Sequence, residues 1–192
     1  WTNYPMAFYP YATLADDGIH FVRLLGDGTY ELVVADSKDF KTKITSGNYV
    51  IGNDIKINGI AITISTIGRC AYLNFRISSL SVTFTPSVHT IRYRSFDNAS
   101  FKNIDFSSVQ TFEDYCGRGI DISGIMKFTN CGPVLGEYTF TESGIAKIDT
   151  GTVPEIGHSA FSACSVTDMS CPNLVALGNT AIYRCNNLVN LY

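Results

Sequence analysis

The chain has 192 residues, of which 45% are hydrophobic and 16% are charged, and its net charge is −3. This composition supplies enough apolar side chains for a core and excludes collagen, coiled-coil, disordered and disulfide-dense classes of protein. The weak acidic charge leaves no electrostatic footprint for a nucleic-acid partner, and the sequence has no apolar run long enough to predict a membrane span.

Aromatic side chains crowd the first residues of the chain, which begins with Trp1 rather than methionine. The aromatic residues of this segment are Trp1, Tyr4, Phe8, Tyr9 and Tyr11. Two interpretations stay open: a platform for a ligand such as carbohydrate, or packing against the following element, which we favour. A removed secretory signal peptide and an arbitrary boundary both account for the start at Trp1.

Two strands are predicted next, over residues 21–25 and 30–34, with the tight turn Gly26-Asp27-Gly28 between them. The stretch 40–66 continues in a β-rich pattern, and its later part predicts an incomplete first coil of the repeat described below. Its regularly spaced isoleucines are Ile55, Ile57, Ile60, Ile62 and Ile64.

From residue 67 onward the sequence repeats itself, with units that start at 67, 91, 112, 135, 156 and 177. Each unit has an apolar start, a small residue and an aromatic four and five residues later, and then spaced apolar residues. The third unit is degraded, with Gly117 at the aromatic position, and a competing phase begins at Tyr115. We prefer the start at Phe112, since the three residues before it then match those before Ile91 and Ile156.

A unit of this length cannot bury its own apolar face, so successive units must stack and place equivalent residues in columns along one core. The small residue followed by an aromatic predicts a tight helical turn, and the later apolar residues predict a bend that enters a short strand paired in parallel with the next. The aromatic column is expected at Tyr72, Phe96, Phe140 and Phe161. The strand pattern aligns Leu80 with Ile104 and Ile125.

The template Ile/Leu-Gly-x-x-Ala/Thr-Phe-x-x-Cys/Ser, found at 135–143 and 156–164 with a variant at 177–185, resembles the BspA-like class of leucine-rich repeat. The resemblance covers the chain from about Tyr49 onward. With the predicted turns and strands, it implies an α/β solenoid, a right-handed leucine-rich-repeat coil with short parallel strands. We expect a solenoid over 49–192 and a β-rich cap over 1–48 formed by the predicted hairpin, because an open solenoid end needs a cover.

The residues that carry chemistry form no known catalytic or metal motif. Zinc would need paired Cys-x-x-Cys spacings, which the sequence lacks, and it also lacks phosphate-binding, dinucleotide and calcium motifs. We expect mostly free thiols, with Cys131 and Cys171 as the candidates for a disulfide. His20, His89 and His158 are interpreted as solvated surface residues, and no cofactor and no enzyme activity are predicted.

Polar residues between the buried ones of the predicted strands form a candidate partner-facing ribbon. Its members are Ser79, Ser81, Asn103, Asp105, Lys147, Asp149, Asp168 and Ser170. Repeat proteins bind macromolecules through such extended surfaces. Because the ribbon has no large aromatic residue and no arginine, which anchor tight interfaces, we expect weak contacts that multivalency makes useful.

The resemblance implies an extracellular or cell-surface binding module that mediates adhesion, with a host matrix protein, another cell or a glycan as the partner. The alternative is an accessory binding domain of a larger secreted enzyme, one that acts on glycans. A free-standing enzyme would need a pocket that joins His89 or His158 to a nucleophile, and solvated positions explain both histidines better.

Overall fold

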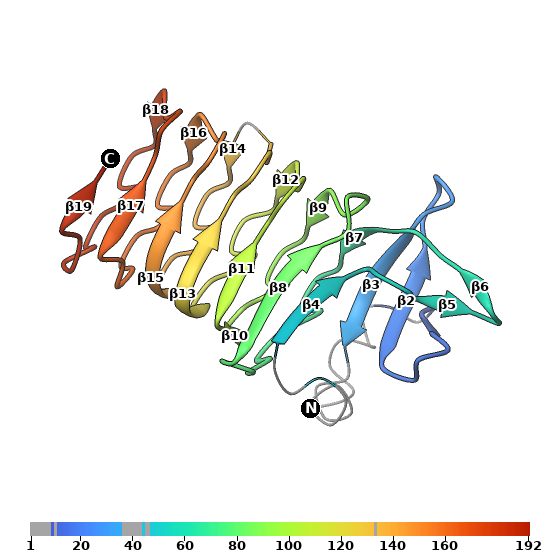
Figure 1. Ribbon diagram of the computed structural model, residues 1–192. Coiled ribbons are helices and arrows are strands. Elements are labelled where there is room, and N and C mark those ends of the chain that lie inside the picture. Colours follow the sequence, from blue (N-terminus) through green and yellow to red (C-terminus); the bar gives the residue numbers. More distant parts are fainter. Residues whose placement is uncertain (1–8, 10, 36–43, 45–46, 133) are drawn as a thin grey trace.

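The computed structural model describes residues 9, 11–35, 44, 47–132 and 134–192. These residues form a β-solenoid whose coils stack along the chain from the N-terminal to the C-terminal end (Figure 1). Parallel strands form its faces, as expected of a repeat solenoid. Within the described ranges no residue is helical, so the α part of the expected α/β class is wrong.

One face of the solenoid is a sheet in which every pair of neighbouring strands is parallel. Its strands are β4 (Gly47–Ile51), β8 (Leu80–Phe84), β10 (Ser100–Phe101), β11 (Asn103–Asp105), β13 (Asp121–Lys127), β15 (Gly144–Asp149), β17 (Asp168–Ser170) and β19 (Asn190–Leu191). The order across the sheet is β19-β17-β15-β13-β11-β8-β4, with β10 beside β13. Each coil therefore contributes to this face.

The second face consists of two-residue strands apart from its four-residue first strand, and each strand ends on a residue predicted as a unit start. They are β7 (Ile64–Ile67), β9 (Thr90–Ile91), β12 (Thr111–Phe112), β14 (Val134–Leu135), β16 (Glu155–Ile156) and β18 (Ala176–Leu177). Strands β7, β9 and β12 pair in parallel, as do β14, β16 and β18. The third unit follows the phase that starts at Phe112.

The predicted hairpin near the N-terminus is confirmed: β2 (His20–Leu24) pairs antiparallel with β3 (Tyr30–Ala35). The short strand β1 (Thr13–Leu14) extends this hairpin, and β3 pairs in parallel with β7 of the solenoid. A second small hairpin joins β5 (Lys56–Ile57) to β6 (Ile60–Ala61). The N-terminal sheet is thus continuous with the second face of the coils.

The segments predicted as helical turns are successions of β-turns. In every unit the third and seventh residues after the start have a left-handed backbone, as at Ser159 (φ 52°) and Ala163 (φ 58°) of the fifth unit. A left-handed residue interrupts a right-handed helix. Alternate N–H groups also bond to the next coil rather than within their own, as from Tyr72 N to Ser95 O at 2.7 Å. The α-helix therefore cannot form here.

The aromatic column expected in the core is present but interrupted. Tyr72 stacks on Phe96 with ring centroids 5.2 Å apart, and Phe140 stacks on Phe161 at 5.5 Å. Gly117 occupies the position between these two pairs, and a Cβ atom there would lie 2.6 Å from the Phe140 ring. The Phe140 ring thus occupies the space that a side chain at Gly117 would need.

A second aromatic column fills the interrupted region. Phe84, Phe106 and Phe128 stack face to face with centroids 5.4 and 5.5 Å apart. Phe106 also contacts Phe96 at 6.0 Å and Phe140 at 5.6 Å. The two columns therefore form one continuous buried aromatic core across the degraded third unit.

The strand register differs from the predicted alignment in two units. Ile104 pairs with Val82 on one side and with Met126 on the other, rather than with Leu80 and Ile125. A β-bulge between Ile122 and Ile125 shifts the strand, and Met126 is fully buried. The first and third units are longer than the second, and the pairing position moves by two residues in the first unit and by one in the third. The two-residue shift keeps the same face of the strand buried, whereas the one-residue shift exchanges the faces, which brings Met126 rather than Ile125 into the core.

Candidate binding surface

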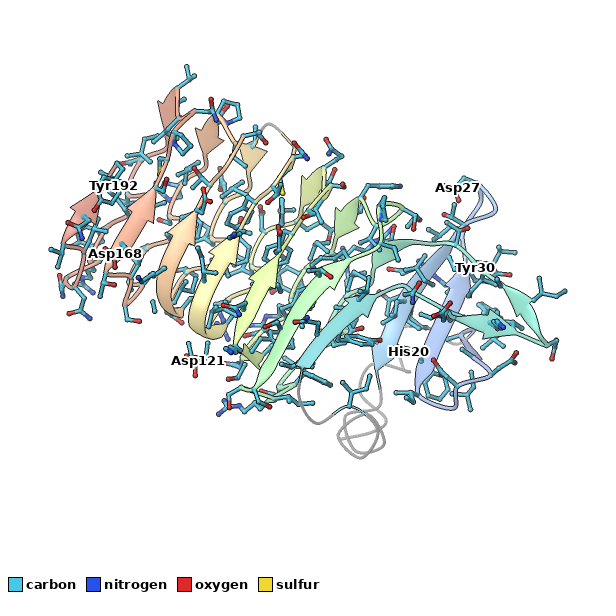
Figure 2. All side chains as sticks on the ribbon, in the orientation of Figure 1. His20, Asp27, Tyr30, Asp121, Asp168 and Tyr192 are labelled. Atoms are coloured by element: carbon cyan, nitrogen blue, oxygen red, sulfur yellow. The ribbon has the colours of Figure 1, made fainter. Side chains whose placement is uncertain are left out.

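Seven of the eight residues of the predicted ribbon belong to strands β8, β11, β15 and β17, where they are exposed or half-buried and each is next to a buried residue. Figure 2 labels one of them, Asp168. Ser81 pairs with Asn103, and Lys147 pairs with Asp168, in neighbouring strands. Asp149 likewise pairs with Ser170. The strands therefore bring these side chains into rows, whereas Ser79 lies in the exposed turn before β8.

Hydrogen bonds join side chains of the ribbon to groups of neighbouring coils. Asn103 Nδ2 donates to Ser81 Oγ at 2.9 Å, and Asn103 Oδ1 accepts from the Ile125 backbone N–H at 2.9 Å. Asn190 Nδ2 donates to Asp168 Oδ1 at 2.6 Å. Hydrogen bonds from Asn190 and Thr167 also lower the pKa of Asp168 below its ordinary value. These contacts give the ribbon a role in holding the coils together.

A second row of the ribbon alternates in charge. Asp105 pairs with Lys127, and Lys127 pairs with Asp149, across three successive strands. Opposite charges in facing positions of neighbouring strands stabilise a sheet modestly. Lys127 was missing from the predicted ribbon, because the shifted register of β13 moves it out of the position that the repeat template gives. The alternation of negative and positive side chains along the row could have indicated that Lys127 belongs to it.

An outer aromatic ladder, formed by Tyr93, Tyr115, Tyr138 and His158, runs along the turns that follow the second face. Successive rings are 6.0, 5.0 and 5.1 Å apart between centroids, and Tyr115 and Tyr138 are parallel within 2°. Tyr138 Oη and His158 Nε2 are hydrogen-bonded at 2.9 Å. Sequence reasoning treated these positions as variable, although aromatic residues recur two or three residues after four unit starts.

Beside the first ring of this ladder is a shallow surface depression of about 410 Å³, lined by Arg69, Tyr93, Glu113 and Asp114. Glu113 Oε2 accepts a hydrogen bond from the Tyr93 N–H at 2.8 Å and lies 3.9 Å from Arg69 Nε. The depression thus offers a guanidinium donor, two carboxylate acceptors and part of an aromatic ring. Such a set can hold a polar group of a partner.

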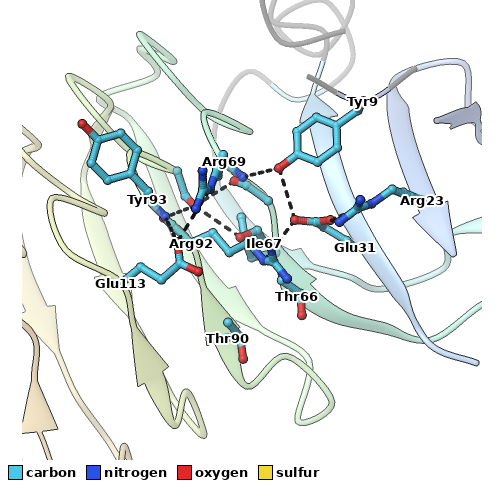
Figure 3. Close-up of polar contacts among 12 residues, drawn as sticks. Tyr9, Arg23, Glu31, Thr66, Ile67, Arg69, Thr90, Arg92, Tyr93 and Glu113 are labelled. Atoms are coloured by element: carbon cyan, nitrogen blue, oxygen red, sulfur yellow. Dashed lines mark hydrogen bonds and ion pairs between the residues drawn. The ribbon is translucent and has the colours of Figure 1, made fainter. Parts of the chain in front are cut away.

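A buried carboxylate joins the N-terminal hairpin to the coils (Figure 3). Glu31 is completely buried, and it accepts from Arg23 Nε at 3.0 Å and from Tyr9 Oη at 3.3 Å. Arg92 of the second unit approaches the same carboxylate, with Nε 3.2 Å from Oε1. Tyr9 Oη in turn accepts from the Arg69 N–H at 3.0 Å. No sequence motif indicated this network, because its residues do not recur from unit to unit and come together at a single place in the fold.

The N-terminal aromatic residues that the structure describes differ in exposure. Tyr9 is 4% exposed and packs with its ring beneath the Arg23 guanidinium, 5.1 Å from the ring centroid, which agrees with the packing interpretation. Tyr11 is 86% exposed. Trp1, Tyr4 and Phe8 lie outside the described residues.

The three histidines occupy different environments, so their common interpretation as solvated residues is wrong. His20 is 3% exposed, pairs with Asp17 through Nδ1, and contacts Tyr49 Oη at 2.9 Å through Nε2. His158 is half-buried as the last ring of the outer aromatic ladder, and only His89 is exposed. His20 begins strand β2 of the hairpin, and its ring lies parallel to that of Tyr49 in β4, with centroids 6.5 Å apart.

All six cysteines are free thiols in the structure, and Cys131 and Cys171 do not pair with each other. Burial raises the pKa of Cys131 to about 12 and also raises the pKa of Cys171. Among the described residues no group of three or more His, Cys, Asp or Glu side chains is placed to hold a metal ion. The described part of the chain also contains no helix with the length and apolarity needed to cross a membrane.

Coils with in-register parallel strands, stacked aromatic columns and a repeated turn define a β-solenoid repeat protein. Residues 44–189 match the family described as BspA type leucine-rich repeat region, in six copies. The chain belongs to this family, as the repeat template indicated.

Among solved structures, the chain matches that of a leucine-rich cell surface protein from Faecalibacterium prausnitzii A2-165. It is 16% identical, the TM-score is 0.48, and the match covers 95% of this chain and 54% of that one. The chain thus spans about half the length of this relative. No curated protein matches the chain.

Proposed function

We propose that this chain is a non-catalytic binding module, presented outside the cell, that attaches to a macromolecular partner through its repeated surface. Membership of a repeat family supports the proposal, because solenoids offer extended, regular surfaces of this kind. Adhesion to a host matrix protein, another cell or a glycan follows from the same resemblance.

The observation that carries the proposal is the outer aromatic ladder with the depression beside it. Tyrosine and arginine are the residues that most often dominate binding energy at protein interfaces. Tyr93 is 36% exposed and lies next to Arg69, which is itself exposed. The ribbon on the larger sheet, by contrast, uses several of its polar groups in hydrogen bonds between coils. We therefore assign the main contacts to the ladder and a weaker contribution to the ribbon.

The test measures binding of the folded chain to immobilised fibronectin, fibrinogen and mixed glycans. We expect one of these surfaces to retain the chain, and we expect the combined change Arg69→Ala and Tyr93→Ala to weaken retention at least tenfold. The matched control combines Lys147→Ala with Ser170→Ala on the ribbon, where a loss of less than threefold is expected. No retention of the folded chain by any surface, or a larger loss in the ribbon variant, would contradict the proposal.

A further inference from the structure

A column of small polar side chains runs through the core at the eighth residue after each of the last three unit starts. Ser143 Oγ donates to Gly117 O at 3.3 Å, Cys164 Sγ to Phe140 O at 3.1 Å, and Cys185 Sγ to Phe161 O at 3.0 Å. Each acceptor is the equivalent carbonyl of the preceding coil. The three side chains therefore have the same orientation.

Cys164 and Cys185 are neighbours in this column, 21 residues apart in sequence. The Ala163 N–H donates to Tyr183 O at 2.7 Å, which joins the two coils one residue before Cys164 and two residues before Cys185. Neighbouring backbones in such an array are about 4.8 Å apart. This separation lies within the range of roughly 4.4–6.8 Å that disulfides span between Cα atoms.

The two thiols differ in exposure and acidity. Cys164 is 2% exposed, whereas Cys185 is half-buried. The contact between the two thiols lowers the pKa of Cys185, whereas the same contact together with burial raises the pKa of Cys164. Burial raises the pKa of Cys70, Cys116 and Cys131 instead. At neutral pH Cys185 is therefore the thiol with the largest thiolate fraction among these, and the thiolate is the reactive form.

We propose that Cys164 and Cys185 form a dithiol site that a low-molecular-weight disulfide oxidises to a disulfide between successive coils. The Cys185 thiolate attacks one sulfur of the small disulfide, forms a mixed disulfide and releases the first small thiolate. Cys164 then loses its proton and attacks Cys185 Sγ, which releases the second small thiolate. The protein loses two hydrogen atoms with their two electrons, and the small disulfide gains them as two thiols.

The test incubates the reduced chain with oxidised glutathione under nitrogen and follows intact mass and released glutathione. We expect a loss of two hydrogen atoms, release of two glutathione molecules per chain, and a non-reduced peptide that links Cys164 to Cys185. The rate should rise with pH, because the attacking group is the Cys185 thiolate.

Serine variants separate the two steps, and Ser143 shows that serine fits this column with the same hydrogen bond. Cys164→Ser should stop at a stable glutathione adduct on Cys185. Cys185→Ser should abolish the reaction, and the control Cys131→Ser should leave it unchanged. An adduct that persists in the unchanged chain, a disulfide that joins another pair of cysteines or two chains, or no reaction at all would overturn the proposal.

Discussion

The coils from Leu135 to Cys185 and the hairpin formed by β2 and β3 are attached to their neighbours by different kinds of contact. In the coils the same atoms of successive units meet again and again, through main-chain hydrogen bonds and stacked rings. At the hairpin the main-chain pairing of β3 with β7 is supplemented by a single buried carboxylate, Glu31, which meets two arginines. The periodic contacts follow from one sequence template, whereas the joint depends on residues that occur once.

The difference predicts that the coils lose stability mainly when packing in the core is lost. The joint, by which we mean the contact of the hairpin with the coils around Glu31, should lose stability mainly when a charge loses its partner. The largest effect is expected for Phe161→Ala, which removes a buried ring stacked on Phe140 and should cost about 3–5 kcal/mol of unfolding free energy. Denaturant unfolding measures this loss. The matched control Tyr183→Ala removes an aromatic ring that is 54% exposed and should change stability by less than about 0.5 kcal/mol. Equal effects of the two changes would contradict the assignment of the core column.

A smaller but more localised effect is expected for Glu31→Gln at the joint. The change keeps the size of the side chain but leaves Arg23 and Arg92 without their charged partner, at a cost of about 1–3 kcal/mol. Both arginines are about one-third exposed, so water offsets part of the loss. Hydrogen exchange should show faster exchange in β2 and β3 and unchanged protection in β15. Uniform loosening of all coils would refute the idea that this network acts at the joint.

The joint should also respond to acid through Asp17. Burial alone would raise the pKa of Asp17, but hydrogen bonds from the His20 side chain and from the backbone of Ile19 and His20 outweigh it and lower the pKa well below its ordinary value. Because the folded pKa is lowered, the stabilisation is complete above about pH 4 and is lost as the pH falls below that value. Unfolding experiments across this range should show a shallower acid dependence for Asp17→Asn. An unchanged pH profile in that variant would remove Asp17 from the account.

The smallest effect tests the backbone of the repeated turn. Ala163 has a left-handed backbone, with φ of 58°, and its side chain is exposed. Glycine adopts this conformation without the penalty that a Cβ atom brings, so Ala163→Gly should stabilise the chain by about 0.5–1 kcal/mol. The control Ala176→Gly, in strand β18, should destabilise it by a similar amount. The same sign in both variants would argue against the left-handed turn.

The contrast between the two regions also explains which features of the fold could be predicted from the sequence. Recurring residues such as Phe140 and Phe161 revealed the coils, because identical positions must stack for any unit to bury its apolar face. The pattern did not reveal that two residues of each turn have a left-handed backbone. Serine and alanine, which occupy these positions at Ser159 and Ala163, are not residue types that favour this conformation. It also placed Ile125 where Met126 lies, because a bulge shifts the register.

The candidate site was predicted in part. The ribbon residues on β8, β11, β15 and β17 lie in rows because strand alternation alone places them there. The outer aromatic ladder was not predicted, since Tyr93 and Tyr115 occupy different positions within their units and meet only after folding. The network around Glu31 joins residues far apart in sequence and has no periodic signal.

The central claim is that equivalent residues of successive coils stack in register, with β-turns between the strands. Nuclear Overhauser contacts between selectively labelled phenylalanine rings test it most directly. The account predicts contacts between Phe140 and Phe161 and between Phe106 and Phe128, together with non-helical chemical shifts over 157–163. Absence of both ring contacts, or helical shifts in that segment, would contradict it.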